Sequence, residues 1–281
     1  KDGDRGLGLM SQQGLEEVVR GLVTLKLSQP VGTTYHYSNL NYTIAGLIVE
    51  KVSGQSYGDY VTQHIFEPLD MRHSYASHIL ALAEGLSEGH HYISHAFKWE
   101  SDRPLSSLPG GGLIASVEDL THYAVAQLND GRYGSTSILS PQGIAELHAP
   151  SISTGGDRHY ALGWAVSTWD GIPTVSHSGN DCCFHSFAIL IPDRGSGVIL
   201  LANADGLELT NLVETIAKGV VGMLYGKPAA PVSVLFGKRF IYWIILVLAY
   251  LHPLLGVQAR TCLKAVIFKI FTLGAAENLN F

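Results

Sequence analysis

The spacing of apolar residues changes near Tyr160, and this change limits the folds open to the chain. Up to that point apolar residues recur at helical spacing, over 15–27, 42–52, 57–66, 116–128 and 140–148. Four short β-rich segments follow, over 160–169, 174–178, 185–191 and 197–202, and then a helical pattern over 207–224. Helices followed by an antiparallel meander and a packing helix predict an α+β fold rather than a repeated βαβ unit.

Local signals set several expected boundaries. Asp170-Gly171 and Asp193-Arg194-Gly195 have the composition of hairpin connections. Ser53-Gly54 is a helix stop, and Ser116 with Asp119 three residues later indicates a capped helix start. Residues 70–110 mix polar and aromatic residues with turn signals, which predicts irregular structure.

Composition excludes some classes of function. Of the 281 residues only 15% are charged, the net charge is −6 and no basic tract occurs, so a nucleic-acid partner is not expected. No Walker loop is present, and no G-x-G-x-x-G follows a strand, so nucleotide chemistry has no support. We expect no cofactor.

A histidine cluster and a pair of adjacent cysteines could carry metal or redox chemistry, but both have simpler structural explanations. His90, His91 and His95 could bind a metal if helical, but their surroundings are loop- or strand-like and supply no carboxylate at ligand spacing. Vicinal Cys182 and Cys183 could be redox-active, or could be two small apolar side chains at a strand turn. Solvated loop histidines and packed cysteines are favoured, and no metal site is expected.

One serine lies in a nucleophile-like motif. Gly54-Gln55-Ser56-Tyr57-Gly58 matches G-x-S-x-G, but a nucleophile elbow needs a strand before it and a helix after it. The preceding segment has a helical pattern that stops at glycine. A corner between two helices is therefore favoured over an elbow.

Two triplets carry more weight together than alone. Tyr37-Ser38-Asn39 precedes the helix expected over 42–52, and His177-Ser178-Gly179 ends an expected strand. A tyrosine can act as a general base when nearby cations lower its pKa from about 10. A glycine in a strand allows another backbone to approach closely. The order of the two triplets and their wide separation form the signal.

At these residues the chain resembles the serine β-lactamase-like superfamily, which includes class C β-lactamases, family VIII esterases, D-aminopeptidases and penicillin-binding-protein-related hydrolases. The resemblance extends over Pro30–Thr33, Ala45–Glu50, Ile65–Met71, Gly111–Leu113 and Leu162–Trp164. It implies an antiparallel sheet flanked by helices, with a helical subdomain and the active site between them. The implied substrate is a small ester, amide or peptide.

The resemblance also implies a role for each site residue. Tyr37 would be the general base or proton relay, and Asn39 would contact the substrate. His177 stands where many relatives carry a lysine, and Ser178 and Gly179 would line the edge strand. The backbone N–H of Asn180 would be an oxyanion-hole donor. Histidine in place of lysine removes a permanent cation, which disfavours carboxylate-bearing substrates.

The superfamily nucleophile, in Ser-x-x-Lys upstream of Tyr-x-Asn, is missing from the sequence. The nearest matches, Thr215–Lys218 and Thr261–Lys264, follow His177-Ser178-Gly179 and are in the wrong order. We therefore expect the domain, over 1–231, to lack its N-terminal part and to be inactive alone. A degenerate, non-catalytic member that acts as a membrane-attached binding module is the alternative.

The residues over 232–281 form an apolar tail. An unbroken apolar or aromatic run over 240–251 continues without charge to Val257, at the lower edge of membrane-spanning length. Lys238 and Arg239 precede the run, and Arg260 and two lysines follow it. The tail is expected to be a C-terminal membrane helix, with a buried core helix as the alternative. Several relatives carry such an anchor, which implies an extracytoplasmic catalytic domain.

Overall fold

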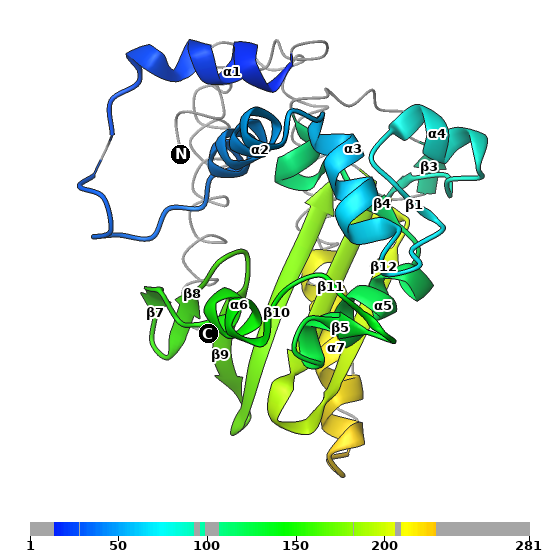
Figure 1. Cartoon of the computed structure of the whole chain (residues 1–281). Helices are drawn as coiled ribbons and strands as arrows, with labels where there is room; N and C mark the ends of the chain where they lie inside the picture. The colour runs from blue at the N-terminus through cyan, green and yellow to red at the C-terminus, as the bar shows by residue number, and fades with distance from the viewer. Residues whose placement is uncertain are drawn as a thin grey trace, which may run out of the picture. The chain divides into compact units, whose positions relative to one another are not determined.

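The computed structural model in Figure 1 describes residues 14–27, 29–92, 96–98, 107–181, 183–205 and 209–228. All of them belong to one unit, Lys1–Ala230. Within this described part, no helix combines the length and the apolar character needed to cross a membrane. The tail expected to form a membrane helix, over 232–281, lies outside the described residues.

The main sheet has six strands in the order β12-β11-β10-β9-β8-β7, and every neighbouring pair is antiparallel. Its strands are β7 (Ile152–Gly155), β8 (Arg158–Tyr160), β9 (Ala165–Trp169), β10 (Ile172–Asp181), β11 (Phe184–Ile191) and β12 (Ser196–Ala202). The spatial order follows the chain order, because short turns join consecutive strands. The expected antiparallel meander is therefore present.

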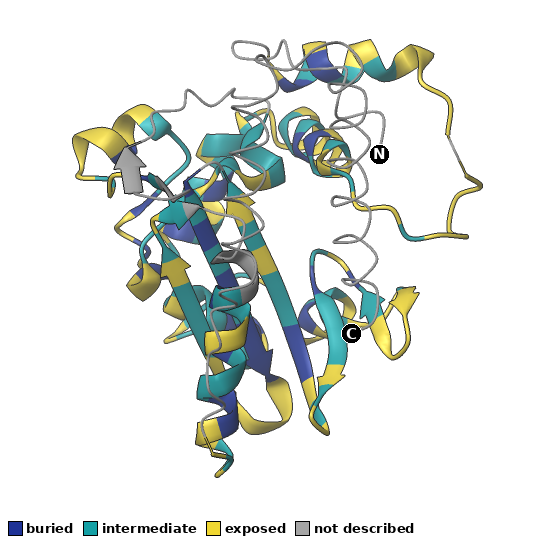
Figure 2. Cartoon of the chain, turned by 180° about the vertical axis from the view of Figure 1, so that it is seen from behind, coloured by how far each residue is buried: buried dark blue, intermediate teal, exposed yellow. Residues whose placement is uncertain are grey.

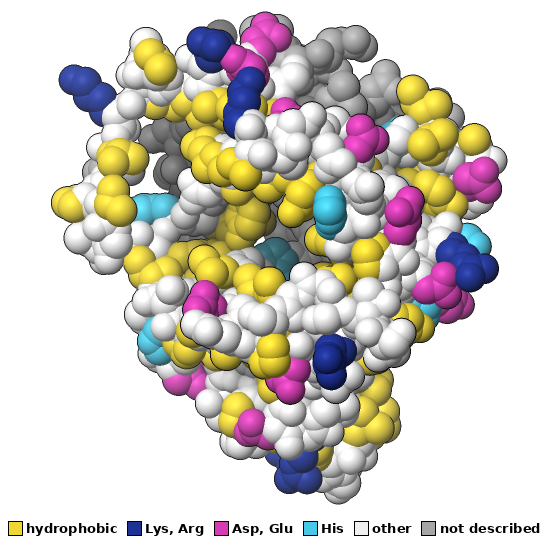
Figure 3. Space-filling model, in the orientation of Figure 1, with side chains coloured by type: hydrophobic (Ala, Val, Ile, Leu, Met, Phe, Trp, Pro, Cys, Tyr) yellow, Lys and Arg dark blue, Asp and Glu magenta, His cyan; other side chains and the backbone are white. Residues whose placement is uncertain are grey.

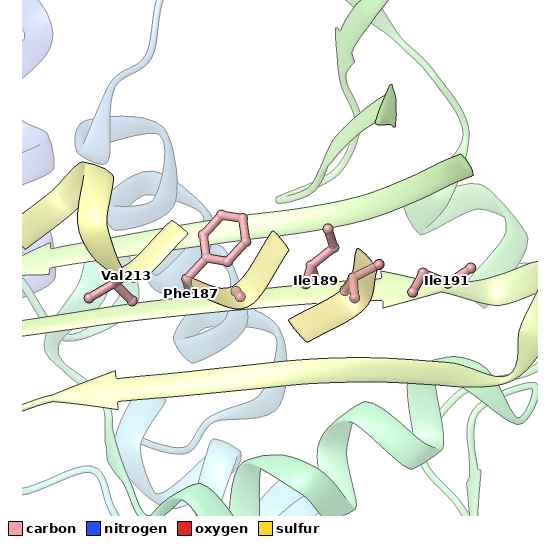
Figure 4. Close-up of a cluster of buried hydrophobic side chains, with 6 residues drawn as sticks. Phe187, Ile189, Ile191 and Val213 are labelled. Atoms are coloured by element: carbon pink, nitrogen blue, oxygen red, sulfur yellow. The ribbon is translucent and has the colours of Figure 1, made fainter. Parts of the chain in front are cut away.

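One face of the sheet packs against helix α7 (Leu209–Leu224). Phe187, Ile189 and Ile191 alternate along β11 and point to the same face, as the two-residue period of a strand requires. They meet Val213 and two further buried α7 residues, Ala217 and Val221 (Figure 4). Each large side chain buried here contributes about 1.5–3 kcal/mol of stability.

The opposite face packs against helix α5 (Val117–Leu128). Val175 and Leu190, directly paired across β10 and β11, are buried there with Trp164. In Figure 2 the buried residues gather along the central strands. Strands β10 and β11 are therefore held from both sides.

The remaining helices and short strands lie outside the main sheet and the two helices packed on it. The helical segments are α1 (Leu15–Gly21), η1 (Leu22–Thr24), α2 (Asn39–Ser53), α3 (Tyr57–Val61), η2 (Thr62–Phe66), α4 (His78–Ala83), η4 (Leu108–Gly112), α6 (Pro141–His148) and η5 (Pro192–Arg194). The short strands are β1 (Ser74–Tyr75), β2 (His90–Tyr92), β3 (Ala96–Lys98), β4 (Ile114–Ala115), β5 (Arg132–Tyr133), β6 (Thr136–Ser137) and β13 (Ala204–Asp205). A further buried cluster joins some of these elements to α5, and consists of Val61, Phe66, Leu69, Met71 and Ala126.

Several predicted boundaries differ from the structure. The helix expected over 15–27 ends at Gly21, continues as a 3-10 turn to Thr24, and leaves Leu25 exposed. The strand expected over 160–169 is two strands, because Ala161 and Trp164 close a tight turn with Gly163 at φ +85°. Residues 70–110 contain helix α4 and several short strands, so the expectation of irregular structure was wrong there.

The start of α5 also differs in detail. Ser116 caps the helix by accepting a hydrogen bond from the Asp119 backbone N–H at 3.1 Å, as predicted. The Asp119 carboxylate does not close a capping box. It accepts hydrogen bonds from the His73 N–H and the Ser74 hydroxyl, both at 2.7 Å. Asp119 therefore ties α5 to β1, a long-range contact that the local motif does not reveal.

Candidate active site

The site begins where β10 outruns one of its neighbours. Strand β9 pairs with β10 only as far as Ser176, which lies opposite Ala165. From His177 to Asp181, β10 pairs with β11 alone. Within the described residues, no strand covers the other side of this stretch. The predicted His177-Ser178-Gly179 triplet thus lies on an open sheet edge.

The structure brings Tyr37 and His177 together. Tyr37 lies in the extended segment before α2, and its ring centroid is 6.5 Å from that of His177. Its ring also meets Tyr160 edge to face at 6.3 Å. About half of the Tyr37 surface, 52%, is exposed, so a substrate could reach it. Two triplets far apart in sequence therefore meet in space.

A chain of hydrogen bonds joins three elements behind Tyr37. The hydroxyl of Tyr42, on α2, lies 3.2 Å from the hydroxyl of Tyr160, on β8. The Tyr160 hydroxyl lies 3.1 Å from Nε2 of His177, on β10. Gly163 lies beside the Tyr42 hydroxyl in the turn between β8 and β9, where its φ of +85° favours glycine.

The surroundings of these rings favour their neutral forms. Burial lowers the pKa of His177, although a hydrogen bond with the Ser178 backbone opposes the shift. Burial and the hydrogen bond with Tyr42 raise the pKa of Tyr160 well above its usual range. Burial also raises the pKa of Tyr35, whose ring lies 5.2 Å from that of Tyr160. At neutral pH, His177 is therefore uncharged and Tyr160 keeps its proton.

The other predicted residues take up distinct places. Asn39 is the first residue of α2 and packs against Gly110, where an added Cβ would lie 3.3 Å from the Asn39 Cβ. Ser178 and Asn180 are exposed on the free end of β10. Gly179 lies opposite Ser186, and a Cβ there would come within 2.3 Å of the Ser186 hydroxyl oxygen. A side chain at position 179 would therefore require the Ser186 hydroxyl to rotate away.

Figure 3 shows the face that carries these elements. It is hollowed beside α2 and β10, and hydrophobic side chains gather around the hollow. A separate pocket of about 720 Å³ lies among β1, α4 and the start of α5, and includes Tyr75, Glu84 and His122. None of the predicted site residues lines that pocket.

The structure also places the other candidate residues, which are Ser56, the histidine cluster and the two cysteines. Ser56 is the N-cap of α3, between two helices, where its hydroxyl accepts from the Asp59 N–H and donates to the Asp59 carboxylate. The expected helix corner is therefore confirmed. His90 and His91 lie on strand β2, not on a helix, and His95 lies outside the described residues. Cys183 is buried, and Cys182 is not described.

Sequence reasoning missed the tyrosines that support His177. The sequence pattern predicts only that Tyr160 starts a strand and that Tyr42 starts a helix. The available signal was the clustering of Tyr35, Tyr37 and Tyr42 ahead of one helix, with Tyr160 just before the Leu-Gly-Trp turn. Sequence alone does not show that these rings converge.

An antiparallel sheet packed between helices, with Tyr-x-Asn at a helix start facing His-x-Gly on a sheet edge, defines the β-lactamase/transpeptidase-like class of α+β proteins. A family model described as Beta-lactamase matches residues 2–219. The chain belongs to the Beta-lactamase family.

Similar proteins agree with this assignment. The chain is 30% identical to Protein flp of Staphylococcus aureus strain MW2 over 217 residues, which is 74% of this chain and 41% of that protein. It is 31% identical to Unguisins hydrolase ungD' of Aspergillus campestris over 200 residues, 67% of this chain and 37% of that protein. The chain thus spans about two fifths of the length of these relatives.

Solved structures show the same fold. The octameric penicillin-binding protein homologue from Pyrococcus abyssi superimposes with a TM-score of 0.66 at 26% identity, and covers 79% of this chain and 49% of that one. A class C beta-lactamase mutant superimposes with a TM-score of 0.61 at 18% identity, over 71% of this chain and 61% of that one. The latter likeness concerns the fold alone.

Proposed function

We propose that this chain is part of a β-lactamase-related serine hydrolase that cleaves a small ester, amide or peptide through an acyl-enzyme. The observation that carries the proposal is the meeting of Tyr37 with His177 at the free end of β10. In this reading Tyr37 moves the proton of the nucleophile and the Asn180 N–H helps to hold the oxyanion. Asn39, Ser178 and Gly179 border the bound substrate.

The nucleophile would come from a segment outside this sequence, because no Ser-x-x-Lys precedes Tyr37. Two surfaces of the described part support a missing partner segment. The outer edge of β12 has no paired strand there, although edge strands are normally covered or blunted. On α2, Ile44, Ile48 and Val52 lie four residues apart and are 37%, 57% and 83% exposed. A further segment could cover both surfaces.

The test is covalent labelling with a fluorophosphonate, which reacts with activated serines. The chain alone should give no adduct by mass spectrometry. The chain extended by the in-frame segment upstream in its gene should be labelled on the serine of a Ser-x-x-Lys. A stable serine adduct on the chain alone would overturn the assignment of a missing nucleophile.

A matched pair of variants tests the role of Tyr37. In the extended protein, Tyr37→Phe should slow labelling about 10²–10⁴-fold, the usual contribution of a proton-transfer residue. Tyr60→Phe, which removes a hydroxyl from a ring on α3 that lies beside His64, should leave the rate unchanged. Equal rates in both variants would remove Tyr37 from the mechanism.

The alternative is a non-catalytic binding module. It gains support if the upstream segment contains no Ser-x-x-Lys and the extended protein stays unlabelled. The bound molecule would then be sought among the same esters, amides and peptides, by binding rather than turnover.

We also propose that the tail over 232–281 anchors the domain to a membrane, with the catalytic domain outside the cytoplasm. The apolar run over 240–251 and its flanking lysines and arginines support this. Deleting 232–281 should abolish the need for detergent during purification. Unchanged detergent dependence would contradict the anchor.

A further inference from the structure

We infer that Tyr160 is a positioning residue that holds His177 as the neutral tautomer protonated on Nδ1, with Tyr42 as the second support. This deepens the function proposed above, because it defines the chemical character of the site wall opposite Tyr37. It concerns two hydroxyls that are not among the residues implied by the family resemblance.

The direction of the hydrogen bonds follows from which atoms can donate. Tyr160 keeps its proton, so its hydroxyl has one hydrogen to give and lies between Tyr42 and His177. The bond between the His177 ring and the Ser178 backbone favours the protonated ring, so the ring donates to that backbone. Since Nε2 faces Tyr160, the donating nitrogen is Nδ1.

One consistent chain results. The Tyr42 O–H donates to the Tyr160 oxygen, the Tyr160 O–H donates to Nε2, and Nδ1–H donates to the Ser178 carbonyl. Reversing the last Tyr160 bond would require a proton on Nε2 and would leave the ring with no Nδ1–H for the backbone. Each residue of the chain comes from a different element: α2, β8 and β10.

The groups that lie against His177 are aromatic rings and one hydroxyl. The rings of Tyr37, before α2, and of Tyr160, on β8, lie beside the imidazole, and the Tyr160 hydroxyl contacts its Nε2. Tyr35 and Tyr42 contact Tyr160, and the charge of Arg158 on β8 acts on the Tyr35 hydroxyl. The lone pair of Nε2 is already used by Tyr160. The wall therefore offers a bound molecule an uncharged ring edge, which suits an ester or amide group better than a carboxylate.

The tautomer can be measured without any turnover. In the full chain with ¹⁵N-labelled histidine, two-bond proton–nitrogen spectra distinguish a protonated nitrogen from a bare one, and His177→Asn identifies the His177 signals. The expected result is a protonated Nδ1 and a bare Nε2. A protonated Nε2 at neutral pH would overturn the inference.

Variants then test the support. Tyr160→Phe removes the donor to Nε2, so the two tautomers should mix and the pKa of His177 should rise, because the neutral ring loses its partner. Tyr42→Phe should give a smaller change of the same sign. Tyr35→Phe keeps a neighbouring ring and removes a hydroxyl that is not part of this chain of hydrogen bonds. It should change neither the tautomer populations nor the pKa of His177.

The controls separate this inference from the proposed function. Thermal melts establish that each variant is folded, and Tyr42→Phe provides the test if Tyr160→Phe is not. An unchanged tautomer and pKa in a folded Tyr160→Phe variant would overturn the role of Tyr160. The fluorophosphonate experiment can fail while the tautomer is as expected, or succeed while it is not, so the two results are independent.

Discussion

Gly46 on α2 lies against the ring of Pro109, so close that a Cβ at position 46 would be 2.3 Å from the Pro109 Cγ and 2.8 Å from its Cβ. The same short helix η4 contains Gly110, which packs on Asn39 at the start of α2. The closeness of helix and loop therefore sets where Asn39 stands in the site.

Gly46→Ala should destabilise the protein by about 1–3 kcal/mol, because a proline ring cannot rotate away from the added methyl group. Urea denaturation measures the change. Gly219→Ala is the matched control, since Gly219 lies inside α7 with nothing within 4 Å of its missing Cβ. That variant should be stabilised by up to about 1 kcal/mol. Similar effects in both variants would contradict the tight packing at Pro109.

Asp119 should contribute more to the free energy of unfolding than its position in the first turn of a helix suggests. Its side chain is buried, and Asp119→Ala would leave the His73 N–H and the Ser74 hydroxyl without their acceptor. An unmet buried donor costs about 1–3 kcal/mol, and only the Ser74 hydroxyl is buried, so a loss of about 1–3 kcal/mol is expected by urea denaturation. Exposed Glu118→Ala, on the same helical turn, should cost less than about 0.5 kcal/mol.

Stability should fall as the pH is lowered through the range where histidines titrate. Burial lowers the pKa of both His177 and His148, so the unfolded chain binds protons before the folded one does. Their contribution is fully present above about pH 6.5 and is lost as the pH falls from there toward their folded pKa values. Urea midpoints at several pH values measure the slope.

Substitution should remove part of that slope. The double variant His148→Gln and His177→Gln should show a flatter dependence between about pH 7.5 and pH 5 than the parent. His36→Gln, at an exposed position, serves as the control and should keep the parent slope. If the double variant kept the parent slope, other groups would be responsible for the acid sensitivity.

Ser56→Ala should lower the stability of the protein but leave its reaction with fluorophosphonate unchanged. Ser56 caps α3, and losing a serine N-cap costs about 1 kcal/mol. Ser56→Thr should recover most of that loss, because threonine can also cap a helix. Fluorophosphonate labelling of the extended protein should proceed at the parent rate in Ser56→Ala. Abolished labelling in that variant would restore Ser56 as a nucleophile.

Local patterns predicted the parts of the fold that local physics controls. Ser140 followed by Pro141 predicted a helix start, and α6 begins at Pro141 with Ser140 as its cap. Asp170-Gly171 predicted a hairpin, and both residues have positive φ between β9 and β10. Turn geometry and capping depend on neighbours along the chain, so a short stretch of sequence is enough to predict them.

The rest of the site depends on partners that sequence spacing does not reveal. Tyr37 and His177 are far apart in sequence, and their contact depends on how α2 docks beside the sheet. Tyr160 lies on a strand, as its sequence pattern predicts, but its hydroxyl partners, on Tyr42 and His177, lie 118 and 17 positions away and are not visible in that pattern. Asp119 has the sequence position of a capping residue, but its carboxylate accepts from His73 and Ser74, which lie 46 and 45 positions away.

The hydrogen bond between Tyr42 and Tyr160 makes the site sensitive to motion that leaves the sheet intact. His177 belongs to a strand held on both faces by packed helices, whereas its outer support sits on α2, whose far side is exposed and apolar. A small withdrawal of α2 would break this link and weaken the support of Tyr160, while β10 and β11 stayed paired and Tyr160 kept its contact with His177. A partial change in the His177 tautomer populations would therefore precede global unfolding and would report separation of α2 from the sheet.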